Sequence, residues 1–536
     1  MKITVKPKHK LDLSSLKIAI LAGISNFLVT FFYASRLNVW GDEAFSIQAT
    51  KLSYAKMIEL TAKDNHPPLY YILLKAWAKI FGYNELGLRV MSMLFMVMAV
   101  IVLVLISYRY FNKKAAVMTG ILLSLSPFAI RMGLEIRMYS MAFLFCSLFL
   151  WAYLEYRNSQ KKILIFLMGI LGALAMYTHY FSVFMIITVL IVDYISLRGE
   201  STKIELVRFF KKSALVKVGV VSFILYLPWI GVFLGRAETL NNAFWVPKPM
   251  LTSPLYTPLN FLFGIDEYFL WGKPALYISL AALAVIIFKF KPLKQNLAKL
   301  DANPQFFSLI FIMPVALMML ISLDMPTSIY YSRYLGLNAF ISFAVLFPAF
   351  LASRKNKSLI YLSLACLVVG NIYLWFYGNT RILAGNQTTA YSAKSVLQCS
   401  LRPDKPNIFL VDDQSEYLIV NYYLDDALGA KSDNYKVYYL TNSDDELKGY
   451  NAWIDAQRYR GAFHSIPKSE VADRLNFEDN NVWYVSPFKP KFGDSKSQFG
   501  IYKNFKPTDV CKADKKLLTG YDIDESYLLK PEPSLK

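Results

Sequence analysis

The chain has 536 residues, of which 55% are hydrophobic, and a formal net charge of +20 at pH 7. This apolar content exceeds that of ordinary soluble proteins and is typical of a multi-pass membrane protein. The basic residues are scattered between apolar runs. That distribution argues against nucleic-acid binding and matches the enrichment of Lys and Arg in cytoplasmic loops.

The first long apolar run covers residues 18–33 and follows a cluster of lysines. This order of charges resembles a secretory signal sequence. The run is long, however, and it lacks a convincing pair of small residues for cleavage. We therefore predict an uncleaved first helix and a cytoplasmic N-terminus.

A helix that crosses the bilayer core needs about 20 mostly apolar residues, and about eleven runs approach this length. They cover residues 17–35, 88–107, 115–130, 138–155, 163–178, 181–196, 214–234, 274–290, 306–322, 335–352 and 359–377. Every second loop between them is basic, as cytoplasmic loops are. An odd number of spans places the residues after 377 outside the cytoplasm.

The remaining loops then share the outer face of the membrane. The first outer loop, residues 36–87, is long, and the second covers only residues 131–137. The loop 235–273 carries aromatic residues that suit the headgroup region of a bilayer. A last outer loop covers residues 323–334.

Residues 379–536 are more polar, and their apolar runs shorten to the length of strands. Residues 407–411, 435–440 and 481–485 are typical of strands, and residues 416–424 have helical spacing. Strands that alternate with helices predict a small extracytoplasmic α/β domain after an all-α membrane domain of residues 1–378.

The four cysteines fall in two settings. Cys146 and Cys366 lie inside predicted spans, where cysteine usually packs as a small apolar residue. Cys399 and Cys511 lie in the predicted outer domain, where an oxidising compartment permits a disulfide. The sequence leaves open whether that bond forms.

Asp42 and Glu43 follow the first predicted span directly. One interpretation is helix capping, with Asp42 as the N-cap of residues 43–50 and Glu43 in the first turn. The other is chemical. A carboxylate at the membrane surface can deprotonate a hydroxyl group or stabilise a developing positive charge on a sugar carbon.

His66 precedes Pro67 and Pro68, which are typical of a first helical turn. Residues 69–80 repeat apolar side chains at helical spacing and predict a helix in the membrane interface. Its N-terminus would offer free N–H groups for a phosphate beside His66. The alternative is that His66 only caps the helix or faces solvent.

Glu135, Arg137 and Tyr139 lie at the second outer loop. The arginine can hold a lipid phosphate through two hydrogen bonds, and the glutamate can orient it or bind a sugar. The alternative is an exposed ion pair that contributes little.

His179, Arg333 and Tyr334 also lie at outer ends of predicted spans. A buried histidine with satisfied hydrogen bonds and an arginine that extends to the headgroups are the simpler interpretations. The topology nevertheless puts all these residues on one face of the membrane. If they meet in one cavity, acidic and basic groups are available for chemistry with a phosphate leaving group.

The chain resembles the GT-C class of membrane glycosyltransferases that use polyprenyl-phosphate sugars. It is similar to the branch with protein O-mannosyltransferases and the aminoarabinose transferases of lipid A. The resemblance covers roughly residues 15–380. It depends on Asp42-Glu43, on residues 65–71, 82–89 and 135–139, and on Arg333-Tyr334-Leu335.

The resemblance implies transfer of a sugar from a polyprenyl-phosphate donor to an acceptor hydroxyl, with inversion at the anomeric carbon. Asp42 corresponds to the family's base, with Glu43 in reserve. His66, Arg137, Tyr139 and Arg333 correspond to the groups around the carrier phosphate. The aminoarabinose branch has lysine where this chain has His66, which speaks against that sugar.

The resemblance leaves the sugar, the acceptor and the role of a divalent metal open. Some members of the class bind such a metal, but no metal-ligand spacing is evident here. A transporter or flippase for a lipid-linked substrate is the chief alternative. Such proteins tend to carry ionisable groups near the bilayer midplane. In either case we expect a protein of the plasma (inner) membrane.

Overall fold

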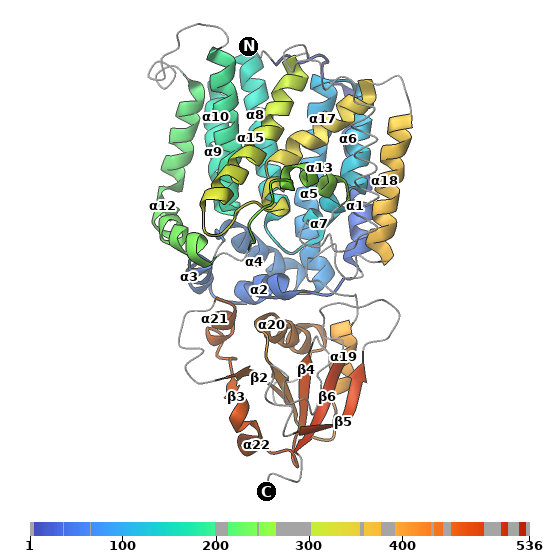
Figure 1. Ribbon diagram of the computed structural model, residues 1–536, viewed down its shortest axis with the longest axis vertical. Helices are drawn as coiled ribbons and strands as arrows, with labels where there is room; N and C mark the ends of the chain where they lie inside the picture. The colour runs from blue at the N-terminus through green and yellow to red at the C-terminus, as the bar shows by residue number, and fades with distance from the viewer. Residues whose placement is uncertain are drawn as a thin grey trace. The chain divides into compact units, whose positions relative to one another are not determined.

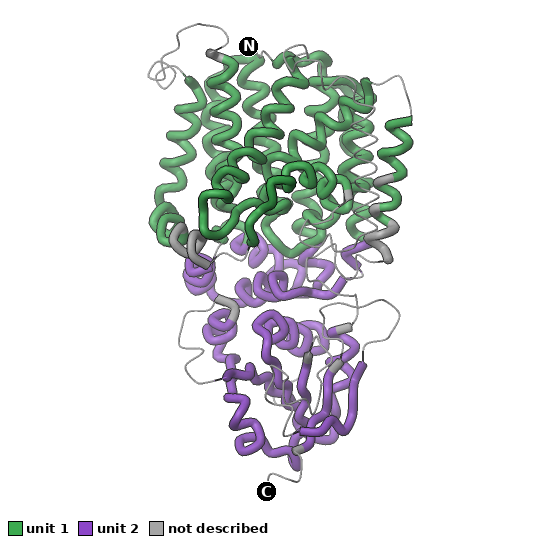
Figure 2. The backbone as a smooth tube through the Cα atoms, viewed as in Figure 1, with its two compact units in different colours: residues 1–32, 65–70, 90–374 green, residues 33–64, 71–89, 375–536 purple. Residues whose placement is uncertain are grey.

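The computed structural model describes residues 5–35, 37–64, 66–198, 213–243, 246–263, 302–353, 358–376, 392–429, 434–442, 452–486, 505–512 and 525–531. The chain forms two compact units, coloured separately in Figure 2. Unit 1 consists of residues 1–32, 65–70 and 90–374. Unit 2 consists of residues 33–64, 71–89 and 375–536.

Unit 1 is helical (Figure 1). It contains most of α1 (Leu13–Ala34) and α5 (Glu85–Tyr110), then α6 (Lys113–Leu125), α7 (Pro127–Leu134), α8 (Tyr139–Ser159), α9 (Ile163–Thr178), η1 (Tyr180–Ser182), α10 (Val183–Arg198), α12 (Ala214–Ala243), α13 (Ser253–Phe263), α15 (Ala302–Asp324), α16 (Ser332–Gly336), α17 (Ala339–Ser353) and nearly all of α18 (Ser358–Phe376).

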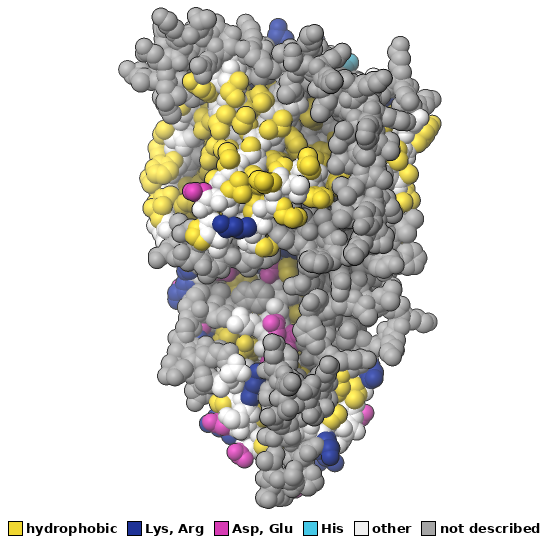
Figure 3. All heavy atoms as spheres, in the orientation of Figure 1, with side chains coloured by type: hydrophobic (Ala, Val, Ile, Leu, Met, Phe, Trp, Pro, Cys, Tyr) yellow, Lys and Arg dark blue, Asp and Glu magenta, His cyan; other side chains and the backbone are white. Residues whose placement is uncertain are grey.

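The surface of unit 1 is apolar where its helices face outward. Figure 3 shows hydrophobic side chains gathered over one face of these helices. Leu21 on α1, Ile163 on α9 and Leu234 on α12 are each more than 60% exposed. A folded protein leaves a continuous apolar surface of this kind only where a nonaqueous neighbour covers it, and here that neighbour is lipid. The predicted all-α membrane domain is confirmed.

Ten of the eleven predicted spans coincide with helices in the described residues, and the span 274–290 lies outside them. By length and composition, five described helices are able to cross a membrane: α1, α5, α8, α12 and α15. A sixth results if α6 and α7 are counted as one span. The helices α9, α10, α17 and α18 are apolar but shorter, so the predicted number of eleven is not established.

The third predicted span, residues 115–130, is not one straight helix. The helix α6 ends at Leu125, and α7 continues at an angle of 61° after the break. Pro127 lacks an N–H group and cannot continue α6, whereas it fits the first turn of α7. Ser126 caps α7 by accepting a hydrogen bond from the Ala129 N–H. Arg131, expected to open a loop, therefore lies inside a buried helix.

Unit 2 contains the helices of the first outer loop, α2 (Gly41–Lys51), α3 (Tyr54–Lys63) and most of α4 (Leu69–Phe81). The predicted helix over residues 69–80 is thus confirmed, and it begins just after Pro68. Lys75 is buried and donates hydrogen bonds to the carbonyl oxygens of Thr50 (2.7 Å) and Leu52 (2.6 Å) at the end of α2. A cation there complements the negative end of the helix dipole.

The rest of unit 2 is an α/β domain with a six-stranded sheet in the order β3-β2-β1-β4-β6-β5. The strands are β1 (Asn407–Val411), β2 (Tyr435–Thr441), β3 (Ser465–Pro467), β4 (Asn481–Ser486), β5 (Phe505–Lys512) and β6 (Glu525–Pro531). The first four are parallel, and β6 pairs antiparallel with β4 and β5. The predicted strands β1, β2 and β4 are confirmed.

The helices of this domain are α19 (Ser392–Ser400), α20 (Gln414–Tyr422), α21 (Ala452–Arg458) and α22 (Val471–Arg474), with a π-helical turn, η5 (Tyr423–Ala427), directly after α20. Asp413 caps α20 by accepting hydrogen bonds from the N–H groups of Ser415 (2.7 Å) and Glu416 (3.3 Å). Cys399 on α19 and Cys511 on β5 form a disulfide, which settles the alternative left open by the sequence.

Candidate active site

Asp42 occupies the first turn of α2. The helix begins at Gly41 with Trp40 at the N-cap position, so the interpretation of Asp42 as the N-cap is wrong. The Asp42 side chain is half-buried, and its carbonyl oxygen accepts a hydrogen bond from the Ser46 hydroxyl (2.9 Å). A carboxylate in the first turn is stabilised by the positive end of the helix dipole.

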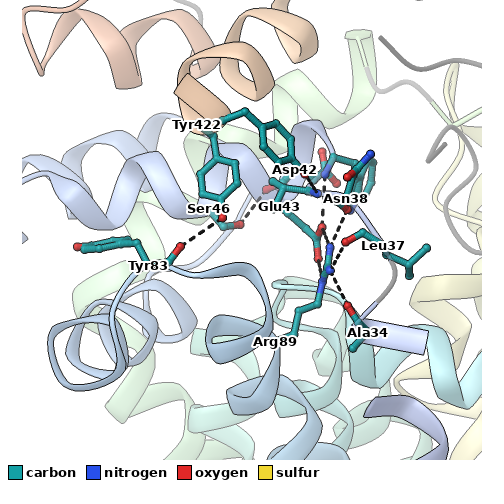
Figure 4. A network of polar contacts seen from close by, with 12 residues as sticks. Ala34, Leu37, Asn38, Asp42, Glu43, Ser46, Tyr83, Arg89 and Tyr422 are labelled. Carbon is teal, nitrogen blue, oxygen red and sulfur yellow. Dashed lines mark hydrogen bonds and ion pairs between the residues drawn. The ribbon is translucent and has the colours of Figure 1, made fainter. Parts of the chain in front are cut away.

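Glu43 is buried and forms an ion pair with Arg89 (Figure 4). Arg89 Nη2 lies 2.8 Å from Glu43 Oε2, and Arg89 Nε lies 3.2 Å from Oε1. The Glu43 carboxylate also accepts a hydrogen bond from the Trp40 N–H (3.4 Å). A carboxylate held in this way by two parallel hydrogen bonds is fixed in direction as well as in charge.

Arg89 has further partners in the chain segment before α2. It donates to the carbonyl oxygens of Ala34 (3.0 Å), Leu37 (2.6 Å) and Asn38 (2.7 Å). Together with Glu43, these contacts use all five N–H groups of the guanidinium. Residues 37–40, directly before α2, lie in no helix or strand, and Arg89 supplies hydrogen bonds to their backbone at Leu37 and Asn38.

A second group of charged residues lies inside unit 1. Arg131, Glu135 and Arg333 are each more than nine-tenths buried. Glu135 Oε1 lies 2.9 Å from Arg131 Nε and 3.5 Å from Arg333 Nη2. One carboxylate thus holds two guanidinium groups. Buried charges are costly unless they are paired in this way.

Arg137 and His66 also meet in unit 1. Arg137 is buried, and its Nη2 lies 3.3 Å from His66 Nε2 and 3.5 Å from Nδ1. The His66 ring in turn lies 6.0 Å from the ring of His179. Glu135 at the end of α7 and Arg137 just before α8 are thus placed by the short connection between these helices.

Aromatic rings surround His179, which is itself buried. The ring centroids of Tyr139 and Tyr334 lie 5.6 Å and 5.3 Å from that of His179. The Arg333 guanidinium lies 5.6 Å from the Tyr139 ring centre, within the range of a cation–π contact. Flat aromatic faces of this kind are suited to a sugar ring.

The protonation of His179 follows from its hydrogen bonds. Its Nδ1 accepts a hydrogen bond from the Phe181 N–H (3.3 Å), so a neutral ring carries its proton on Nε2. That Nε2 is buried and has no hydrogen-bond partner among the described residues. A buried donor without a partner carries a free-energy cost that a bound acceptor would remove.

The structure thus brings the sequence-predicted residues together in two groups. Unit 1 holds His66, Glu135, Arg137, Tyr139, His179, Arg333 and Tyr334, and unit 2 holds Asp42 and Glu43. Arg89 and Arg131 were not assigned a role from the sequence. Their position within helices that contain long apolar stretches is the signal that indicates one, because ionisable groups are expensive there.

Metal ligands give no comparable signal. Within the described ranges, no group of three or more His, Cys, Asp or Glu side chains lies close enough to hold a metal ion.

A comparison with protein families finds one that matches part of the chain. The profile of the family described as dolichyl-phosphate-mannose-protein mannosyltransferase matches residues 65–231. This region includes His66, the connection between α7 and α8, and His179. No curated protein sequence matches the chain.

Two solved structures share the fold over nearly the whole chain. ArnT from Cupriavidus metallidurans bound to undecaprenyl phosphate superposes with a TM-score of 0.54 at 10% sequence identity, covering 95% of this chain and 97% of ArnT. The same protein in the apo state gives a TM-score of 0.51 at 12% identity, covering 87% and 92%. Both comparisons confirm the fold that the sequence resemblance implied.

Proposed function

We propose that this chain, a multi-pass membrane protein with the GT-C glycosyltransferase fold, transfers a sugar from a polyprenyl-phosphate donor to an acceptor hydroxyl group. Three observations support the proposal: the sequence motifs, the family match over residues 65–231, and the fold shared with ArnT. ArnT is itself a protein solved with a polyprenyl phosphate bound.

The observation that carries the proposal is the buried cationic group of unit 1. Arg131 and Arg333 share the single carboxylate of Glu135, and Arg137 lies beside His66. Charged groups inside a membrane domain are retained where they bind something. Arginine binds a phosphate with two parallel hydrogen bonds, and Arg131, Arg137 and Arg333 are all buried in this part of unit 1.

We assign the neighbouring rings to the sugar. Tyr139 and Tyr334 offer aromatic faces, and the Nε2–H of His179 offers a hydrogen bond to a sugar hydroxyl or a phosphate oxygen. Glu135 orients two arginines and thereby fixes the direction from which a phosphate is held. The apolar polyprenyl chain would lie against lipid, where it costs nothing to accommodate.

The reaction is a single displacement. The acceptor oxygen attacks the anomeric carbon, and the bond from that carbon to the phosphate oxygen breaks. The electron pair of this bond stays on the phosphate, where the guanidinium groups stabilise it. The proton of the acceptor hydroxyl passes to the Asp42 carboxylate, which acts as general base. One displacement inverts the anomeric centre.

Asp42 is favoured over Glu43 as the base. Glu43 already has two hydrogen bonds to Arg89 and one from a backbone N–H group, so it is committed to holding the loop. Asp42 is more exposed than Glu43 and lies in the first turn of α2.

We place the reaction on the extracytoplasmic face of the plasma (inner) membrane, with the N-terminus in the cytoplasm. The alternation of basic loops supports this orientation. The disulfide between Cys399 and Cys511 supports it separately, because such bonds persist in oxidising compartments.

The proposal is tested with purified protein and a polyprenyl-phosphate sugar that carries a radioactive label in the sugar. We expect the label to move to an acceptor or, slowly, to water. A transporter or flippase would move the intact donor across a vesicle membrane and leave the sugar attached to it. Movement without cleavage of the sugar–phosphate bond would therefore reject the proposal.

The assignment of Arg137 predicts the effect of its removal. Arg137→Ala should weaken binding of the polyprenyl-phosphate carrier by about tenfold or more, because a hydrogen bond to a charged group contributes roughly 1.5–3 kcal/mol. The measurement is the apparent affinity for the donor in the transfer assay. Arg109, which pairs with Glu155 elsewhere in unit 1, provides the control. Arg109→Gln should leave the affinity unchanged, and an unchanged affinity in Arg137→Ala would contradict the assignment.

A further inference from the structure

We infer that the C-terminal domain positions the catalytic loop, and that Tyr423 is the residue through which it does so. The inference rests on the proposed role of Asp42 as the base. Tyr423 lies nearly four hundred residues after Asp42 in the sequence, in a domain to which the proposed reaction assigns no role.

The contact is a hydrogen bond between the two ends of the chain. The Val39 N–H donates to the Tyr423 hydroxyl at 2.8 Å, across a sequence separation of 384 residues. Both side chains are buried, Tyr423 completely. Val39 stands only three residues before Asp42, so this bond acts on the backbone that leads directly into the catalytic turn.

The Tyr423 hydroxyl stays protonated while it accepts this hydrogen bond. Burial raises the pKa of Tyr423 well above its usual range, and the negative charge of Glu85 at the start of α5 raises it further. A neutral hydroxyl therefore accepts from the Val39 N–H and keeps its own proton.

Neighbouring residues of the C-terminal domain contact α2 and the segment before α5 at further points. The Tyr422 hydroxyl donates to the Tyr83 carbonyl oxygen (3.3 Å), a contact visible in Figure 4. Asp426 forms an ion pair with Lys51 at the end of α2. Arg460 donates to Gln48 in the middle of the same helix. The helix α2, whose first turn contains Asp42, is thus attached to the domain at its middle and at its end.

Tyr423 and Arg89 complement each other at the start of this helix. Arg89 donates to carbonyl oxygens of residues 34, 37 and 38, and Tyr423 accepts from the N–H of residue 39. A segment without regular structure keeps one conformation only when its backbone groups have such partners. A general base needs that precision, because a displacement of about 1 Å costs a reaction on the order of a hundredfold.

The turn that carries Tyr423 is unusual in itself. Residues Tyr423–Ala427 form a π-helical turn directly after α20. Such turns are rare and are found frequently at functional sites. This turn carries Tyr423 and also Asp426, so two of the contacts with the first outer loop depend on it.

The test is the variant Tyr423→Phe, which removes one oxygen atom and keeps the ring. We expect turnover to fall by about tenfold or more, while the Michaelis constant for the donor changes less than twofold, because the phosphate-binding residues are untouched. We also expect faster amide hydrogen exchange over residues 37–43. A contact that only adds stability would change neither the turnover of the folded enzyme nor the exchange of this segment selectively.

Tyr417 on α20 provides a matched control. It is fully buried, and its hydroxyl donates to the Ala462 carbonyl oxygen (3.2 Å) and accepts from the His464 N–H (3.2 Å), both inside the C-terminal domain. Tyr417→Phe loses buried hydrogen bonds of the same kind and should keep normal turnover. If Tyr423→Phe does not fold, Val39→Pro removes the N–H donor of the same hydrogen bond and leaves the tyrosine intact.

Asp42→Asn separates this inference from the function on which it rests. If Asp42→Asn is inactive and Tyr423→Phe turns over within twofold of the unaltered enzyme, the inference is wrong and the proposed function stands. If Asp42→Asn is active, the proposed base is wrong. Tyr423→Phe is then judged by hydrogen exchange alone, and unchanged exchange over residues 37–43 overturns the inference.

Discussion

Asp42→Asn should reduce sugar transfer by at least about a hundredfold, since general base catalysis contributes roughly 10²–10⁴. Asparagine has nearly the same shape as aspartate but cannot accept the proton of the acceptor hydroxyl. We expect the variant to insert into membranes and to stay folded, and the transfer assay measures the loss.

Glu59 supplies the control for this substitution. It lies on α3 in the same loop, is largely exposed, and pairs with Lys63. Glu59→Gln removes one carboxylate from the loop and should leave transfer near normal. Normal turnover in Asp42→Asn would show that Asp42 is not the base, and another carboxylate of the loop would then have to accept the proton.

The membrane spans and the central strands are predictable because both are continuous apolar runs of a characteristic length. An apolar run of about 20 residues has few alternatives to a membrane helix. The run Asn407–Val411 is followed by a polar turn, and the structure makes it the fully buried strand β1. Parallel strands covered on both faces show such continuous apolar runs.

The strands β5 and β6 are harder to recognise. The strand β5 mixes buried and exposed residues irregularly, includes Pro507 and carries a bulge between Pro507 and Asp509. Proline and bulges are tolerated at the edge of a sheet, where hydrogen bonds are not needed on both sides. The resulting sequence lacks the alternation by which a strand is identified.

The candidate site is predictable in its members but not in its pairing. Polar residues at the ends of apolar runs stand out, which is how Asp42, Glu43 and Arg137 are found. The partner of Glu43 lies 46 residues away, and that of Val39 lies 384 residues away. Hydrogen bonds over such separations leave no periodic mark in the sequence, because they depend on how whole helices pack.

The second large effect is expected from Arg89. Arg89→Met leaves the Glu43 carboxylate buried without its cation and deprives three carbonyl oxygens of their donor. Breaking a buried ion pair from one side costs about 3–5 kcal/mol. We expect unit 2 to unfold at a temperature lower by roughly 5 °C or more, and transfer to be lost with it. Thermal unfolding in detergent measures the first effect and the label assay measures the second.

The double variant Arg89→Met/Glu43→Gln distinguishes the two roles of the arginine. With both charges removed, no buried ion remains unpaired, and part of the stability should return. Transfer should stay low, because the carbonyl groups of residues 34, 37 and 38 still lack a donor and Asp42 is no longer held in place. Arg474→Met serves as the control, since that arginine pairs with Glu470 on the exposed surface and should cost about 1 kcal/mol or less. Recovery of transfer together with stability in the double variant would show that only the ion pair matters, and that the hydrogen bonds of Arg89 to the backbone do not place the base.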